Sequence, residues 1–135
     1  MTVQEISLTV PANLVISSNR RSEIWKRKGL KDVVKPQALV LAKKHLTPVD
    51  SATVYVGITK GNKNAYDPAN LTDTFKPAID GIVAAGILPD DSHKHVLGPW
   101  PYHHGHDKTL GRNIRLTITL IPYQQQLIDR LRRGA

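Results

Sequence analysis

Acidic side chains gather in one part of a chain that is otherwise strongly basic. Five of its eleven acidic residues fall between positions 67 and 91: Asp67, Asp73, Asp80, Asp90 and Asp91. Clustered carboxylates repel one another unless a cation lies between them, and ligand sets made only of oxygen suit Mg²⁺ or Mn²⁺. Lys76 stands among these acids, where it could contact a phosphate beside a metal. The cluster therefore favours metal-assisted phosphodiester chemistry, although a solvated polar helix face would have the same composition.

A helix is predicted to carry the first three of these acids, beginning at Asp67 and running to Ala85, and Asp90 and Asp91 follow a few residues after it. Asp67 is a favourable N-cap, Pro68 suits the first helical position, and Gly86 is a typical terminator. At about 100° per residue, one side of this helix is apolar. That side consists of Leu71, Phe75, Ala78, Ile79, Ile82 and Val83. The opposite side consists of Asn70, Asp73, Lys76 and Asp80.

The charge of the whole chain points to a polyanionic partner. Nineteen Lys and Arg against eleven Asp and Glu give a net charge of +8 and a pI near 9.9. A domain with this charge most often binds nucleic acid, although a basic surface can also simply maintain solubility. One early segment is expected to contact the DNA backbone through Asn19, Arg20, Arg21, Lys26, Arg27, Lys28 and Lys31.

Five of the six histidines lie between positions 93 and 106, in a segment rich in Gly and Pro. A zinc site built from His103, His104 and His106 is one interpretation, but zinc ligands usually sit on rigid elements at regular spacing. A loop that contacts DNA through these rings, with Trp100 and Tyr102, is a second interpretation. A plain surface loop is a third, and the sequence leaves all three open.

Composition and length exclude several classes of protein and several kinds of site. The 135 residues suit one domain, positions 1–135, and the absence of cysteine excludes disulfides, a cysteine nucleophile and thiolate metal sites. No apolar run approaches a membrane span and no leader pattern begins the chain, so we expect a cytoplasmic protein with no membrane partner. The sequence has no Ser-His-Asp constellation, phosphate-binding glycine loop or dinucleotide fingerprint, so no organic cofactor is expected.

The pattern of elements predicts an α+β fold in which a small mixed sheet of about four strands has helices packed on one face, in the order β-α-β-α-β-β. The expected strands are 3–10, 52–59, 93–97 and 112–121, with helices at about 22–45 and 67–85. A loop is expected from Gly98 to Gly111, and the residues from Tyr123 to Arg133 suggest a short basic helix or a frayed tail.

The acidic block resembles the RusA-type Holliday junction resolvases, small endodeoxyribonucleases of bacteria and their phages. The residues that carry the resemblance are Asp67, Asn70, Leu71, Lys76, Asp80, Ala85, Gly86, Asp90 and Asp91. The resemblance implies a metal-dependent, structure-specific endodeoxyribonuclease that resolves four-way DNA junctions by paired phosphodiester hydrolysis. It also implies a homodimer, because paired incisions in a two-fold symmetric junction need two sites. The expected location is then the cytoplasm of a bacterium or of a phage-infected host.

Roles follow residue by residue from this resemblance. Asp67, Asp73, Lys76 and Asp91 are the expected catalytic residues, and Asp67, Asp73, Asp90 and Asp91 the expected ligands of Mg²⁺, with Mn²⁺ as a substitute. The second acid of the family motif is Ala69 here, and Asp73 is expected to replace it. An ungapped alignment instead puts Asn70 and Thr72 at the positions of the early acids, which predicts a weak or inactive enzyme. A branched-DNA-binding protein with little or no catalysis is therefore the alternative.

Overall fold

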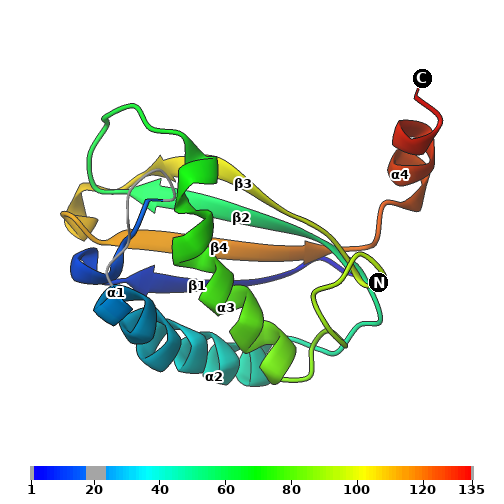
Figure 1. Ribbon diagram of the computed structural model, residues 1–135, viewed down its shortest axis with the longest axis horizontal. Helices are drawn as coiled ribbons and strands as arrows, with labels where there is room; N and C mark the ends of the chain where they lie inside the picture. Colours follow the sequence, from blue (N-terminus) through cyan, green and yellow to red (C-terminus); the bar gives the residue numbers. More distant parts are fainter. Residues whose placement is uncertain (1, 18–23, 135) are drawn as a thin grey trace.

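The computed structural model describes residues 2–17 and 24–134, and it contains one four-stranded mixed sheet (Figure 1). The strands are β1 (Gln4–Val10), β2 (Ala52–Lys60), β3 (Val96–His106) and β4 (Ile114–Ile121). Their order is β1-β4-β2-β3, with β2 and β3 parallel and the other two pairs antiparallel. The predicted α+β class, the mixed sheet and the order of the elements are confirmed.

Among the described residues, three helices lie on one face of this sheet (Figure 1). They are α1 (Ile24–Gly29), which continues through a π-helical turn η2 (Leu30–Val34) into α2 (Lys35–His45), and α3 (Thr72–Ala84), which follows a short 3-10 turn η3 (Pro68–Leu71). The predicted helix near 22–45 is thus continuous from Ile24. Pro36 has no backbone N–H to donate, and the change from π-helical to α-helical hydrogen bonding falls next to it, at Lys35.

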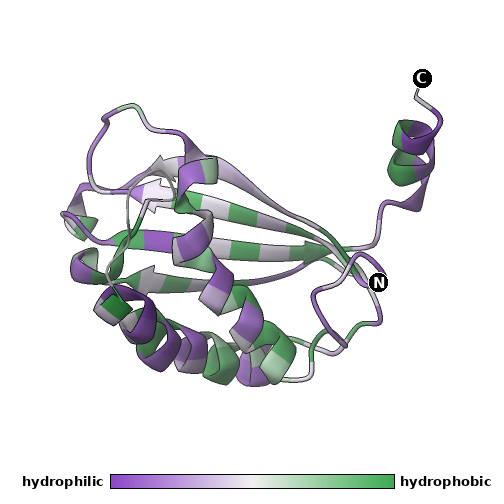
Figure 2. Cartoon of the chain, in the orientation of Figure 1, coloured by the Kyte–Doolittle hydropathy of each residue, from purple (hydrophilic) through white to green (hydrophobic). Residues whose placement is uncertain are grey.

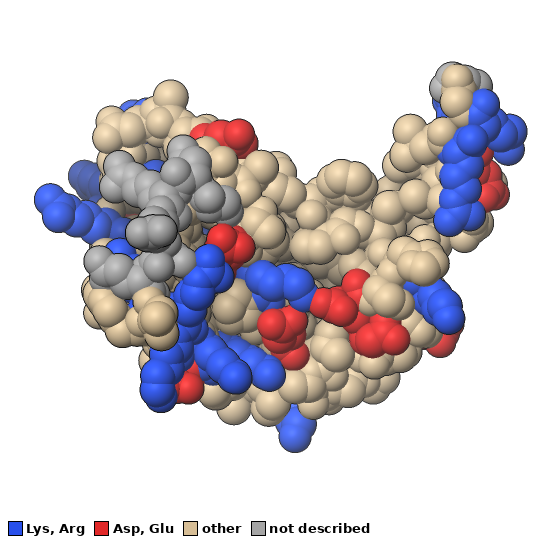
Figure 3. All heavy atoms as spheres, in the orientation of Figure 1, with Lys and Arg blue, Asp and Glu red and all other residues tan. Residues whose placement is uncertain are grey.

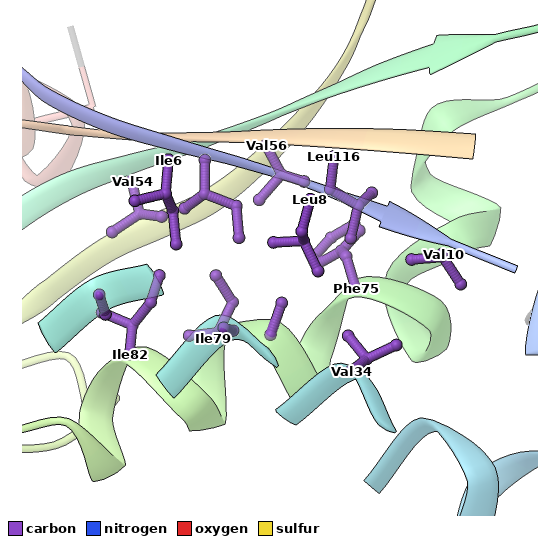
Figure 4. Close-up of a cluster of buried hydrophobic side chains, with 14 of the residues drawn as sticks. Ile6, Leu8, Val10, Val34, Val54, Val56, Phe75, Ile79, Ile82 and Leu116 are labelled. Atoms are coloured by element: carbon purple, nitrogen blue, oxygen red, sulfur yellow. The ribbon is translucent and has the colours of Figure 1, made fainter. Parts of the chain in front are cut away.

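Hydrophobic side chains from both layers meet in one core (Figure 4). Alternate residues of the strands face the helices. Figure 2 shows hydrophobic residues alternating with more polar ones along the strands. The labelled strand residues are Ile6, Leu8, Val10, Val54, Val56 and Leu116, and the labelled helix residues are Val34, Phe75, Ile79 and Ile82. Phe75 and Ile79 are 1% exposed, which confirms the predicted apolar side of α3.

Helix α3 packs closely against α2 through a glycine. A Cβ added at Gly81 would stand 2.4 Å from the carbonyl oxygen of Lys35, so only glycine permits this approach. The N-terminal end of α3 is preceded by the predicted cap, since the amide of Ala69 donates to Oδ1 of Asp67 at 3.0 Å. At the other end Gly86 has φ of 82°, a conformation that favours glycine and turns the chain out of the helix. These contacts fix where the polar side of α3 lies.

The loop predicted from Gly98 to Gly111, which contains most of the clustered histidines, is wrong over most of its length. Residues 98–106 are not a loop, because β3 runs from Val96 to His106 along β2. Pro99 and Pro101 lack the amide donor of a sheet ladder, and β3 tolerates them as an edge strand with a neighbour on one side only. Edge position is a tertiary property, so the local composition predicted a loop instead.

The C-terminal helix α4 (Gln125–Arg132) follows β4 and projects from the sheet (Figure 1), which agrees with the predicted short basic helix. Its leucines Leu127 and Leu131 are 44% and 60% exposed. Within residues 2–17 and 24–134, no helix has the length and apolar composition needed to cross a membrane.

Candidate functional site

One lysine joins two of the clustered acids on the exposed side of α3. Nζ of Lys76 donates to Oδ1 of Asp80 at 3.0 Å and also to Oδ2 of Asp91. Asp80 lies one turn further along α3, whereas Asp91 reaches Lys76 from the turn that follows Gly86. That turn is anchored by Ile87 and Leu88, both 2% exposed. The two carboxylates therefore present oxygens to a single position that a cation occupies.

The electrostatics of this position favour the charged form of the lysine. Partial burial by itself would lower the pKa of Lys76, but the hydrogen bonds from Lys76 to Asp91 and Asp80 outweigh it and raise the pKa above its ordinary value. The side chain of Lys76 is 40% exposed, and those of Asp80 and Asp91 are 43% and 47% exposed. All three groups can therefore be reached by a ligand from solvent.

A cavity connects this site with the basic helix. Its volume is about 460 Å³, and four cations and two acids line it: Arg27, Lys31, Lys35, Lys76, Asp73 and Asp80. Nη2 of Arg27 lies 3.4 Å from Oδ2 of Asp73, which joins α1 to α3 across the opening. Figure 3 shows acidic and basic side chains side by side over this part of the helical layer. The excess of positive charge suits a phosphate, which would approach Lys76 from this cavity.

The four acids predicted as metal ligands have separate surroundings. Asp67 caps η3, Asp73 pairs with Arg27, and Asp91 contacts Lys76. Asp90 accepts from the amide of Ser92 at 2.8 Å, and hydrogen bonds from Ser92 lower the pKa of Asp90 below its ordinary value. In the described part of the chain, no three His, Asp or Glu side chains come close enough together to hold one metal ion.

The pair that does converge is Asp80 with Asp91, and Asp80 was not among the predicted ligands. The signal for it was present, because Asp80 is four residues after Lys76 and therefore one helical turn away. Mg²⁺ is commonly held by one or two carboxylates together with waters and substrate phosphates. Two exposed carboxylates that already flank a cation position, with no sulfur ligand near them, fit that chemistry.

The predicted DNA-contact residues divide into three groups. Asn19, Arg20 and Arg21 lie outside the described residues. Lys26 lies over the ring of Trp25 at 5.7 Å, and Lys28 pairs with Asp32 at 2.8 Å.

Arg27 and Lys31 line the cavity of the acidic site, together with Lys35, which was absent from the predicted set. Lys35 lies near this cavity because α2 packs against α3, and local sequence patterns do not predict that packing. These three residues are the described cations best placed to hold a phosphate chain beside Lys76.

The histidines of β3 do not converge. His103 bonds through Nδ1 to the hydroxyl of Tyr66 at 2.5 Å, and His104 through Nδ1 to the hydroxyl of Tyr102 at 3.0 Å. His106 bonds through Nε2 to the carbonyl oxygen of Gly61 at 3.2 Å. The three rings thus contact three different partners, an arrangement that favours fixed rings along an edge strand over a shared zinc site.

No protein-family model matches the chain, and no curated protein matches it significantly.

Proposed function

We propose that the protein is a metal-dependent, structure-specific endodeoxyribonuclease that acts on four-way DNA junctions. The observation that carries this proposal is the cavity in which Lys76, flanked by Asp80 and Asp91, meets the cations of α1 and α2. A phosphodiester needs neutralisation of its charge, and its hydrolysis needs carboxylates that can hold a divalent cation. The cations of this cavity and its acids Asp73 and Asp80, with Asp91 at Lys76, support the proposal on both points.

The chain's own residues divide the work. Arg27, Lys31 and Lys35 bind the DNA backbone and orient it over the cavity through charge-assisted hydrogen bonds. Lys76 stabilises the negative charge that develops on the scissile phosphate. Asp91, with Asp80 or with Asp73 and Asp67, would hold Mg²⁺ or Mn²⁺, which when bound activates a water and stabilises the leaving oxygen.

A second copy of the chain belongs to this proposal. A four-way junction has two-fold symmetry, and resolving it requires one incision in each of two strands. A homodimer places two equivalent sites on one substrate. Light scattering coupled to size-exclusion chromatography measures the oligomeric state, and a protein that stays monomeric with and without junction DNA would contradict this part of the proposal.

One structural observation favours the alternative, a branched-DNA-binding protein with little catalysis. Ala69 leaves the 3-10 turn before α3 without the second acid of the family motif, and no three-acid cluster forms among the described residues. The basic cavity would still bind DNA in that case, because backbone binding needs cations and not a metal.

A cleavage assay separates the two functions. A synthetic four-way junction is incubated with wild type, with Asp91→Asn and with Asp129→Asn as a matched control on α4. We expect incision by wild type and the control in Mg²⁺, and none by Asp91→Asn. Junction binding by Asp91→Asn should be equal or tighter, because a negative charge near the phosphate is removed. Binding without incision by wild type in either Mg²⁺ or Mn²⁺ would support the alternative.

A further inference from the structure

A second polar cavity lies on the sheet face that the helices leave uncovered. Ile58 is in the core, and successive residues of a strand point to opposite faces, so Thr59 points away from the helices. Thr59 pairs with Arg115 of β4 on one side and with Gly105 of β3 on the other. All three residues line a cavity of about 530 Å³, together with His104, Asp107 and Lys108. The cavity is therefore built on the ends of three adjacent strands.

The one carboxylate in this cavity accepts hydrogen bonds from nearby donors on both of its oxygens. Oδ1 of Asp107 accepts from the amide of Thr109 at 3.0 Å and from its hydroxyl at 2.6 Å. Oδ2 of Asp107 accepts from Nη2 of Arg115 at 2.9 Å. These hydrogen bonds, with Thr109 the larger cause and Arg115 the next, lower the pKa of Asp107 to about 2. Asp107 is thus ionised at neutral pH, and the hydrogen bond that it accepts from Arg115 fixes the position of the guanidinium.

Two cations and a buried hydroxyl of this cavity can donate hydrogen bonds to a ligand. Arg115 has N–H groups beyond the one given to Asp107, and Lys108 is exposed and forms no ion pair with any described residue. Thr59 is 4% exposed, and among the described residues its Oγ1 is the buried side-chain polar atom that lacks a hydrogen-bond partner. A buried hydroxyl without a partner is costly, and an acceptor brought into the cavity would offset that cost. A Cβ at Gly105 would meet no atom within 4 Å, so space is open at Gly105, the β3 neighbour of Thr59.

We propose that this cavity binds a phosphate group. A guanidinium held by a carboxylate, an unpaired ammonium and a threonine hydroxyl are donors that a tetrahedral oxyanion can use together. The phosphate belongs either to a nucleic-acid backbone or to a small phosphorylated molecule, because both present the same oxygens. The site goes beyond the proposed nuclease activity, since it lies on the sheet face opposite to the helices that carry Lys76.

Titration with inorganic phosphate tests this site in the absence of metal. Amide chemical shifts are followed in EDTA at constant ionic strength, for wild type, Thr59→Val, Lys108→Gln and the control Lys44→Gln on α2. We expect saturable shifts at Thr59, Gly105 and Arg115. Thr59→Val should raise the dissociation constant about tenfold and Lys108→Gln roughly fivefold, as expected for the loss of one hydrogen bond to a charged group. Lys44→Gln should leave it unchanged.

A parallel titration with a short DNA duplex identifies the source of the phosphate. Shifts of the same amides, with weaker DNA binding by Thr59→Val, would support a backbone phosphate. Phosphate binding without these DNA effects would support a small phosphorylated ligand.

Two results would overturn the proposal: no saturable shifts with phosphate in wild type, or equal weakening by Lys108→Gln and Lys44→Gln. Lys108 is exposed, so its variant keeps the test decisive even if Thr59→Val does not fold. Because the assay contains no metal and no cleavage step, its failure is separate from a failure of the nuclease proposal.

Discussion

The cavity on the sheet and the site on the helical layer each pair a cation with aspartate, and they differ in what else the aspartate does. On the sheet, Asp107 gives one oxygen to Arg115 and the other to the turn at Thr109. On the helical layer, Lys76 lies between Asp80 and Asp91, neither of which caps a turn. The side chain of Asp107 is 30% exposed and that of Asp91 is 47% exposed.

This difference separates a structural ion pair from an exchangeable one. Removing Asp107 would leave a turn uncapped and a guanidinium without its partner, so we expect a loss of stability. The Lys76 contacts are half exposed, and such pairs contribute little to stability because water replaces them readily. A lysine whose partners can be exchanged is free to move to a phosphate. The sheet site is therefore suited to presenting a fixed guanidinium, and the helical site to a lysine that exchanges partners, as the proposed cleavage requires.

The largest effect on junction cleavage is expected from replacing Lys76, the lysine between Asp80 and Asp91. Lys76→Gln should reduce junction cleavage by about 100-fold or more, because one preorganised donor to the reacting phosphate is lost. Its melting temperature should stay within about 2 °C of wild type, as expected for a half-exposed pair. Gel-based cleavage and calorimetry measure the two quantities. Cleavage at the wild-type rate would show that Lys76 belongs only to a solvated surface network.

A smaller effect is expected at Asp73, whose role the resemblance and the structure describe differently. If Asp73 replaces the acid missing at Ala69, Asp73→Ala should raise the Mg²⁺ concentration for half-maximal cleavage roughly fivefold to tenfold. Adding Ala69→Asp to this variant should restore part of the affinity.

The Mg²⁺ dependence of the cleavage rate provides the measurement, with Asp32→Ala as a control acid on the π-helical turn. Normal cleavage by Asp73→Ala at low Mg²⁺ would restrict Asp73 to its contact with Arg27 and leave the metal to Asp80 and Asp91.

Removing Asp107 from the sheet cavity should lower the stability of the protein without lowering its cleavage rate. Asp107→Ala should lower the melting temperature by about 3–5 °C, because the turn at Thr109 loses its cap and Arg115 loses its partner. Its cleavage rate at saturating junction DNA, measured well below the melting temperature, should equal that of wild type, because a change in binding at the sheet cavity does not affect the rate at saturation. Calorimetry and the cleavage assay together check this, and a loss of cleavage in folded Asp107→Ala would contradict the separation of the two sites.

The smallest effect is a change in how stability depends on pH. The pKa of Asp107 is lowered to about 2, so its contribution is present above the unfolded value near 4 and is lost as the pH falls from about 4 to 2. The melting temperature of Asp107→Asn should therefore fall less steeply than that of wild type in this range. The raised pKa of Lys76 acts at alkaline pH. The stability contributed by charged Lys76 is lost only above about pH 10.5. If the melting temperatures of wild type and Asp107→Asn fall equally steeply between pH 4 and 2, the stabilising role assigned to ionised Asp107 is contradicted.

Local chemistry in the sequence predicted most of the fold. The cap at Asp67, the turn at Gly86 and the apolar side of α3 each depend on residues close together in the chain, and all three are confirmed. The strand β3 could not be predicted in the same way. Its Gly and Pro content is typical of a loop, and only its place at the edge of the sheet, beside β2, makes it a strand.

Composition and helical periodicity already place Asp73, Lys76 and Asp80 on one side of α3 in a basic chain, because these features depend on residues close together in the sequence. Which acids meet depends on tertiary packing. The turn after Gly86 brings Asp91 to Lys76, and the packing of α2 on α3 brings Lys35 to the same cavity. Likewise, the pairing of β2 with β4 sets Thr59 beside Arg115, residues far apart in the chain. Such contacts depend on how layers pack and strands register, which local sequence patterns do not specify.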